Sequence, residues 1–62
     1  MEVKTFLRIM KLRREIDSAL VVAARNTEEC VRGSNRLAGE LALKASERLT
    51  ALLKELIEES GK

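Results

Sequence analysis

Apolar residues recur every three or four positions through the first half of the chain. That spacing places them in one stripe along an α-helix, and the stripe comprises Ile9, Leu12, Ile16, Ala19 or Leu20, and Ala23. Near the amino end the stripe is widened by Val3, Phe6, Leu7 and Met10. The pattern predicts a helix over about residues 3–31. Helix propensity is poor at Asn26 and Thr27, so a break in the helix is possible there.

A second apolar stripe follows, with members again three or four residues apart: Ala38, Leu41, Ala45, Leu49, Leu52 and Leu56. It predicts a second helix over about residues 35–59. Turn-forming residues are concentrated between the two stripes, over residues 32–35. There Gly33 is suited to the left-handed conformation that ends a helix, and Ser34 or Asn35 is suited to cap the next helix. A further glycine, Gly61, stands where the second helix should stop.

Two helices joined by a tight turn form an all-α helical hairpin, a single domain over residues 1–62. One line of contact between two helices cannot cover stripes this broad, least of all the uninterrupted apolar run over residues 19–24. Two hairpins packed face to face would cover them, and we expect an antiparallel dimer that forms a four-helix bundle. The residues expected in its core are Leu12, Ile16, Leu20, Ala23, Leu41, Ala45, Leu49, Leu52 and Leu56.

The small size of the chain supports the same expectation. A chain of 62 residues buries only ~60% of its unfolded surface, and small domains of this kind are usually stabilised by disulfides, a metal or a partner subunit. The single cysteine, Cys30, cannot form an internal disulfide, and the chain has no histidine. Self-association is the means of stabilisation that remains.

Composition gives little support to catalysis. Histidine and tyrosine are absent, and Cys30 follows Glu28 and Glu29, whose negative charge opposes formation of a reactive thiolate. The remaining carboxylates are scattered, without metal-ligand spacing. We therefore expect a non-enzymatic protein with no cofactor and no metal site.

Basic residues are concentrated near the amino terminus, although the net charge is only +2. On a helix, Lys4, Arg8, Lys11 and Arg14 share one face. Such a stripe suits an acidic protein surface or a nucleic acid backbone. These are the expected partner contacts of a small dimeric module that binds or regulates through protein–protein interaction.

An alternative fold would use the first residues differently. Val3–Ile9 also alternates apolar and polar residues with a period of two. A strand followed by two helices resembles the ribbon-helix-helix repressors, in which paired strands of a dimer enter the DNA major groove. That resemblance implies a DNA-binding transcriptional regulator in which Lys4, Phe6 and Arg8 point toward the DNA. No turn-forming residue separates Ile9 from Leu12, which argues against a strand-to-helix junction.

The apolar segments of the chain are too short to form a membrane span or the core of a signal peptide, and the predicted location follows from this. The run over residues 19–24 is far shorter than the ~20 residues that span a bilayer. No apolar core of a signal peptide follows Met1, because Lys4, Arg8 and Lys11 interrupt the segment. With its lone cysteine, the chain is expected to be soluble and cytoplasmic, without a membrane partner.

Overall fold

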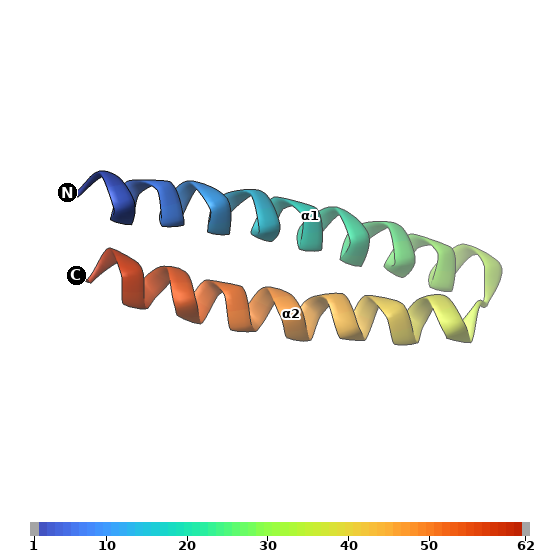
Figure 1. The fold of residues 1–62 in the computed structure, drawn as a ribbon. Coiled ribbons are helices and arrows are strands. Elements are labelled where there is room, and N and C mark those ends of the chain that lie inside the picture. Colours follow the sequence, from blue (N-terminus) through green and yellow to red (C-terminus); the bar gives the residue numbers. More distant parts are fainter. Residues whose placement is uncertain (1, 62) are drawn as a thin grey trace.

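Two antiparallel helices make up the structure, a computed structural model that describes residues 2–61. Helix α1 spans Val3–Gly33 and helix α2 spans Arg36–Ser60. The helices lie side by side, so that both ends of the chain are at the same end of the hairpin (Figure 1). The predicted all-α helical hairpin is confirmed.

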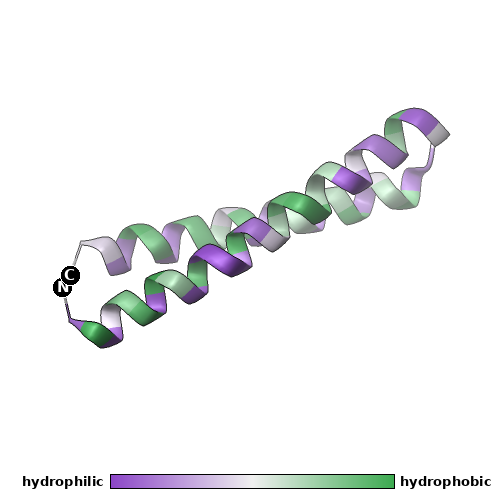
Figure 2. Cartoon of the chain, turned by 90° about the horizontal axis from the view of Figure 1, so that it is seen from above, coloured by the Kyte–Doolittle hydropathy of each residue, from purple (hydrophilic) through white to green (hydrophobic). Residues whose placement is uncertain are grey.

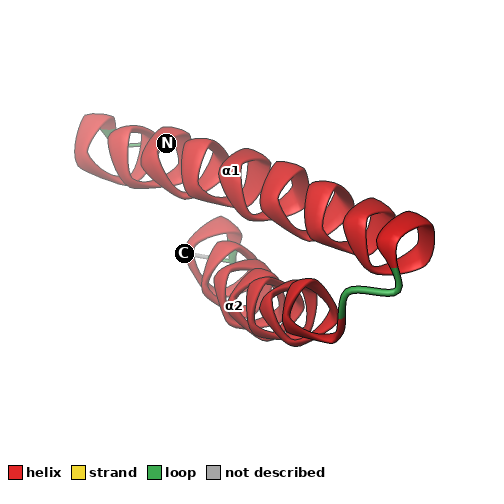
Figure 3. Ribbon diagram, turned by 90° about the vertical axis from the view of Figure 1, so that its right-hand side faces the viewer, coloured by secondary structure: helices red, strands yellow, loops and turns green. Residues whose placement is uncertain are grey.

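The alternative strand at the amino end is wrong. Residues 3–9 belong to α1, and residues 2–61 contain no strand (Figure 3). The segment joins the following stripe in helical phase, and no residue between Ile9 and Leu12 interrupts the helix. A ribbon-helix-helix arrangement therefore does not form.

Helix α1 also continues without a break through Asn26 and Thr27. Both side chains hydrogen-bond to backbone carbonyls one turn earlier: Asn26 Nδ2 donates to the oxygen of Val22 at 2.8 Å, and Thr27 Oγ1 donates to the oxygen of Ala23 at 2.7 Å. These bonds use the polar side chains without opening the backbone ladder. The poor helix propensity of the pair is therefore outweighed by the long helix on either side.

The turn differs from the prediction by one residue. Helix α1 includes Gly33, whose φ is not positive, and the left-handed residue is Ser34, with φ 50° and ψ 39°. The chain reverses only after the last helical residue, so the left-handed conformation falls on Ser34. Asn35 caps α2 as expected, because its Oδ1 accepts a hydrogen bond from the backbone N–H of Ala38 at 3.2 Å. Gly61 follows the last residue of α2, as predicted, and its N–H donates to the carbonyl of Ile57 at 3.1 Å.

The core is a narrow seam between the helices. Leu12, Ile16 and Ala19 of α1 pack with Leu52 of α2, and Leu49 and Leu56 are partly buried against them. Ala19, the most buried of these at 2% exposure, takes the seam position that the sequence pattern left open between Ala19 and Leu20. Toward the turn the buried residues of α2 are all small, namely Ala38, Ala42 and Ala45. No charged or polar side chain of residues 2–61 is buried in this seam.

The hairpin is a thin rod, with extents of 47 × 14 × 11 Å. It exposes 5069 Å² of surface, whereas a compact domain of 7.0 kDa would expose about 4,000 Å². Leu20, Val31, Leu53 and Ile57 are among the large apolar side chains that stay exposed, so the seam leaves apolar surface in contact with solvent.

Candidate functional site

The hairpin seam accounts for only part of the residues predicted to form the dimer core. Leu12, Ile16, Ala45 and Leu52 are buried within one chain, and Ala23, Leu49 and Leu56 are half-buried. The two remaining residues, Leu20 and Leu41, are 48% and 43% exposed. Leu20 lies on one side of the seam, with Ala24 and Val31, and Leu41 lies on the other side, with Val22.

The seam divides the surface into two faces. Successive residues of a helix are about 100° apart around its axis, so the neighbours of an inward-facing residue lie on opposite sides of it. On α1, Val22 and Ala24 flank the inward-facing Ala23; on α2, Glu55 and Ile57 flank Leu56. We call the face that contains Val22 and Glu55 the charged face, and the face that contains Ala24 and Ile57 the apolar face.

On α1, the apolar face is an open surface along the half of the helix nearest the turn. Leu20, Ala24, Thr27 and Val31 follow one another at helical spacing and line this surface together. Val31 is 77% exposed. Toward the amino end the same side of the helix carries the charged residues Arg13 and Asp17, seven positions before Leu20 and Ala24, and then the exposed Phe6. Figure 2 shows apolar segments recurring along both helices between hydrophilic ones.

On α2, the apolar face carries no charge at all. Around the helix axis, the charged residues of α2 fall within an arc of about 140°, and the apolar face lies outside it. Beyond the seam residues Ala42 and Leu49, this flank consists of Gly39, Leu43, Ser46, Thr50, Leu53 and Ile57. Ile57 is 72% exposed, and Leu53 is also exposed. A half-circumference without charge, of which only one edge is covered by α1, is typical of a helix with a second packing partner.

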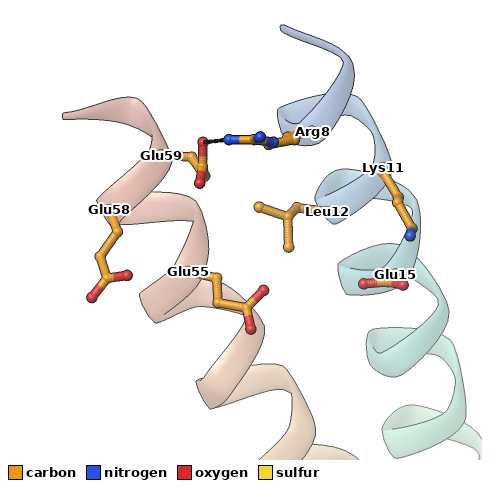
Figure 4. A pocket seen from close by; sticks show the side chains of 7 residues that line it. All are labelled: Arg8, Lys11, Leu12, Glu15, Glu55, Glu58 and Glu59. Atoms are coloured by element: carbon orange, nitrogen blue, oxygen red, sulfur yellow. Dashed lines mark ion pairs between the residues drawn. The ribbon is translucent and has the colours of Figure 1, made fainter. Parts of the chain in front are cut away.

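The charged face begins, near the chain ends, with a groove of about 420 Å³. Its lining brings Arg8 and Lys11 together with four carboxylates, Glu15, Glu55, Glu58 and Glu59 (Figure 4). Arg8 Nη1 lies 3.8 Å from Glu59 Oε2, an ion pair that joins the two helices. The groove is therefore acidic on balance.

Two residues of the predicted basic stripe, Arg8 and Lys11, lie within this acidic groove. All four residues, Lys4, Arg8, Lys11 and Arg14, are exposed on α1 as expected. However, Arg8 is paired with Glu59, and Lys11 lines the same groove as three carboxylates of α2. Only the packing of α2 against α1 brings these acids to the stripe, because they are more than forty positions away along the chain.

A second groove, of about 330 Å³, lies on the charged face nearer the turn. Its floor is largely apolar, with Ala19 and Val22 from α1 and Leu41 and Ala45 from α2. Lys44 and Arg48 stand at its edge, and neither makes an ion pair within residues 2–61. Sequence reasoning missed this pair of cations, although their spacing of four residues beside Leu41 and Ala45 was a usable signal.

Residues 2–61 contain no candidate metal centre. No group of three or more cysteine and carboxylate side chains in this range could hold a metal ion. Cys30 is a free, half-buried thiol. Neither helix, over the described range, has a stretch long and apolar enough to cross a membrane. No protein-family profile, curated protein or solved structure matches this chain.

Proposed function

We propose that this chain is a small non-enzymatic interaction module that works as a homodimer. Two hairpins pack through their apolar faces into a four-helix bundle, and the charged faces remain outside for contact with another protein. The observation that carries the proposal is the uncharged flank of α2, from Gly39 to Ile57, which α1 covers at only one edge.

The exposed area is of the size that a stable dimer requires. The surface of the hairpin, 5069 Å², exceeds that of a compact domain of equal mass by about 1,000 Å². A standard protein–protein interface buries about 800 Å² on each partner. Burial of the apolar part of this excess, at about 25 cal/mol per Å², favours association over isolated hairpins.

For the protein partner of the dimer we propose an acidic surface. Lys44 and Arg48 flank an apolar groove and have no internal counterion among the described residues, so a carboxylate-bearing partner would complement them. Lys4 and Arg14 of the predicted stripe would extend this contact, whereas the ion pair with Glu59 makes Arg8 less available. We place this regulatory contact in the cytoplasm, where the free thiol of Cys30 would stay reduced.

Sedimentation equilibrium on the wild type and two variants tests the dimer. Ile57→Glu places a charge on the apolar face and should convert the dimer into monomers. Leu37→Glu is the matched control: Leu37 is 64% exposed and lies about 160° around α2 from Ile57, among the charged residues of that helix, so this variant should remain dimeric. A wild type that is monomeric and fully folded at micromolar concentration would contradict the proposal.

A further inference from the structure

Two opposite charges interrupt the apolar face of α1. Arg13 and Asp17 share a side of the helix with Leu20 and Ala24, because seven residues make nearly two whole turns. Both charged residues are exposed, and neither makes an ion pair within residues 2–61. Their order, with the cation nearer the amino end, is the less favourable one for pairing within a helix. A dimer that covers this face must therefore bring a counterion to each charge, because a buried charge without one is strongly destabilising.

We propose that the second copy of the chain supplies these counterions in an antiparallel dimer, with α1 packed against α1. This inference rests on the proposed dimer and adds its orientation and register. A two-fold axis perpendicular to α1 at the level of residue 15 places Arg13 of one copy against Asp17 of the other. The symmetry repeats the same ion pair on the other side of the axis.

The apolar residues of α1 are paired by the same axis. They form one stripe with the two charges, at alternating spacings of four and three residues: Phe6, Met10, Arg13, Asp17, Leu20 and Ala24. The stripe is symmetric about residue 15, so Phe6 of one copy faces Ala24 of the other. Met10 faces Leu20 in the same way. The alternating spacing is that of helices packed along a common seam, and this register matches side-chain size as well as charge.

The alignment of the two helices gives the level of this axis on α2. Within the hairpin Arg8 lies opposite Glu59, and Cys30 lies opposite Gly39. Residue 15 of α1 is therefore level with about residue 53 of α2. An antiparallel dimer with α1 against α1 also sets α2 against α2, so the uncharged flank of α2 must accept an axis near that level.

The uncharged flank of α2 does accept such an axis. When two copies run antiparallel about a point between residues 51 and 52, each large side chain of the flank faces a small one, which avoids both overpacking and voids. The facing pairs are Leu53 with Thr50, Ile57 with Ser46, and Leu43 with Ser60. This point differs from the level set by α1 by about 2 Å along the helix. The tilt of roughly 20° between helices of such bundles accommodates a difference of this size.

The parallel arrangement leaves both charges without counterions. A two-fold axis along the bundle would set α1 of one copy against the uncharged flank of α2 of the other, in the same register as within the hairpin. Arg13 and Asp17 would then face the stretch between Thr50 and Ile57, whose residues on this flank are apolar or carry a hydroxyl group. Burial of two charges against such a surface opposes the parallel dimer.

Charge reversal tests the register. Asp17→Arg leaves only positive charge at the two positions, and Arg13→Asp leaves only negative charge. Each variant alone should dimerise about tenfold more weakly or worse, because like charges face each other across the axis. An equimolar mixture should form heterodimers about as tight as the wild-type dimer, since each copy then faces the opposite charge at both positions. Sedimentation equilibrium measures the three samples.

Rescue in the mixture cannot arise from pairing within one helix, because each variant carries a single sign of charge at positions 13 and 17. A mixture that associates no more tightly than the variants alone would overturn the register. The same is true if each variant alone dimerises as tightly as the wild type.

Spin labels at the turn report the orientation directly. In a Cys30→Ala background, Ser34→Cys carries the label, and electron–electron double resonance measures the distance between the two labels of a dimer. Position 34 is 19 residues from residue 15, so the antiparallel arrangement predicts roughly 55–60 Å. A distance of about 20 Å or less would show neighbouring turns and would overturn the antiparallel pairing.

Sedimentation of the wild type separates this inference from the proposed function. If the wild type is monomeric, the proposed function fails. If it is dimeric but the labels are close together or the mixture shows no rescue, the dimer stands and only its orientation and register fail.

Discussion

The sulfur atom of Cys30 in α1 lies directly over Gly39 in α2, near the turn. A Cβ atom added to Gly39 would be 2.9 Å from Cys30 Sγ, well inside the normal separation of non-bonded heavy atoms. A glycine within a helix costs ~0.5–1 kcal/mol of stability relative to alanine. At position 39 this cost accompanies the close approach of the Cys30 side chain, which belongs to α1.

We expect Gly39→Ala to destabilise the parent protein by about 1 kcal/mol, because the thiol must move from a packed position. In a Cys30→Ala background the obstacle is absent, and the same change should stabilise by ~0.5–1 kcal/mol. A double-mutant cycle of urea unfolding measures the coupling. All variants need the same protein concentration, since the stability of a dimer depends on it. Equal effects in both backgrounds would contradict the contact.

Leu52 should be among the most costly residues of the seam to truncate. It is buried at 8% exposure and packs in the core cluster with Ile16 and Ala19, so Leu52→Ala is expected to cost ~2–5 kcal/mol. Leu37→Ala removes the same atoms from a position that is 64% exposed and should change stability by less than ~0.5 kcal/mol. Thermal unfolding followed by circular dichroism compares the two. A similar loss at both positions would mean that the seam is not where the structure places it.

The two residues of the turn should respond in opposite directions. Asn35→Ala removes the side-chain oxygen that accepts from the N–H of Ala38 and should cost ~0.5–2 kcal/mol. Ser34 holds φ at 50°, a conformation that costs a residue with a Cβ atom roughly 1–2 kcal/mol. Ser34→Gly should therefore stabilise the hairpin, by up to ~1 kcal/mol once the greater freedom of glycine in the unfolded chain is included. Denaturation midpoints check both signs, and a loss of stability in Ser34→Gly would contradict the left-handed turn.

Duplex DNA should bind only weakly at ~0.15 M salt, because Glu55, Glu58 and Glu59 line the same groove as Arg8 and Lys11 and add negative charge beside them. Fluorescence anisotropy of a labelled duplex measures this affinity. Replacing Glu55 and Glu58 by glutamine should strengthen binding and steepen its salt dependence, as removal of local negative charge predicts. Tight binding by the wild type, lost in Arg8→Ala, would instead support a nucleic acid function.

The parts of the structure that were predictable are those that depend on neighbours along the chain. The spacing of Leu12 and Ile16, or of Leu49, Leu52 and Leu56, is a property of one helix and needs no partner. The cap at Asn35 likewise reaches only to Ala38. The position of the left-handed residue was missed by one, since Gly33 and Ser34 are both compatible with a turn there and the helix could end at either.

The candidate surfaces were harder to predict because they depend on how the two helices are rotated and aligned. The basic stripe on α1 is a feature of one helix, but its acidic surroundings come from the far end of the chain. Lys44 and Arg48 likewise meet the α1 residues of their groove only because the two helices pack together.

The sequence alone determined that this protein is a helical hairpin with more apolar surface than one seam can hide, since helix period, turn residues and the absence of proline act locally. Only the tertiary structure decided which apolar residues the seam uses, Ala19 rather than Leu20, and which are left on an open face. The physical reason is that each apolar arc is wider than one helix–helix contact. Several rotations of each helix about its own axis would satisfy the hydrophobic pattern of the sequence. Close packing of particular side chains across the seam selects one of these rotations.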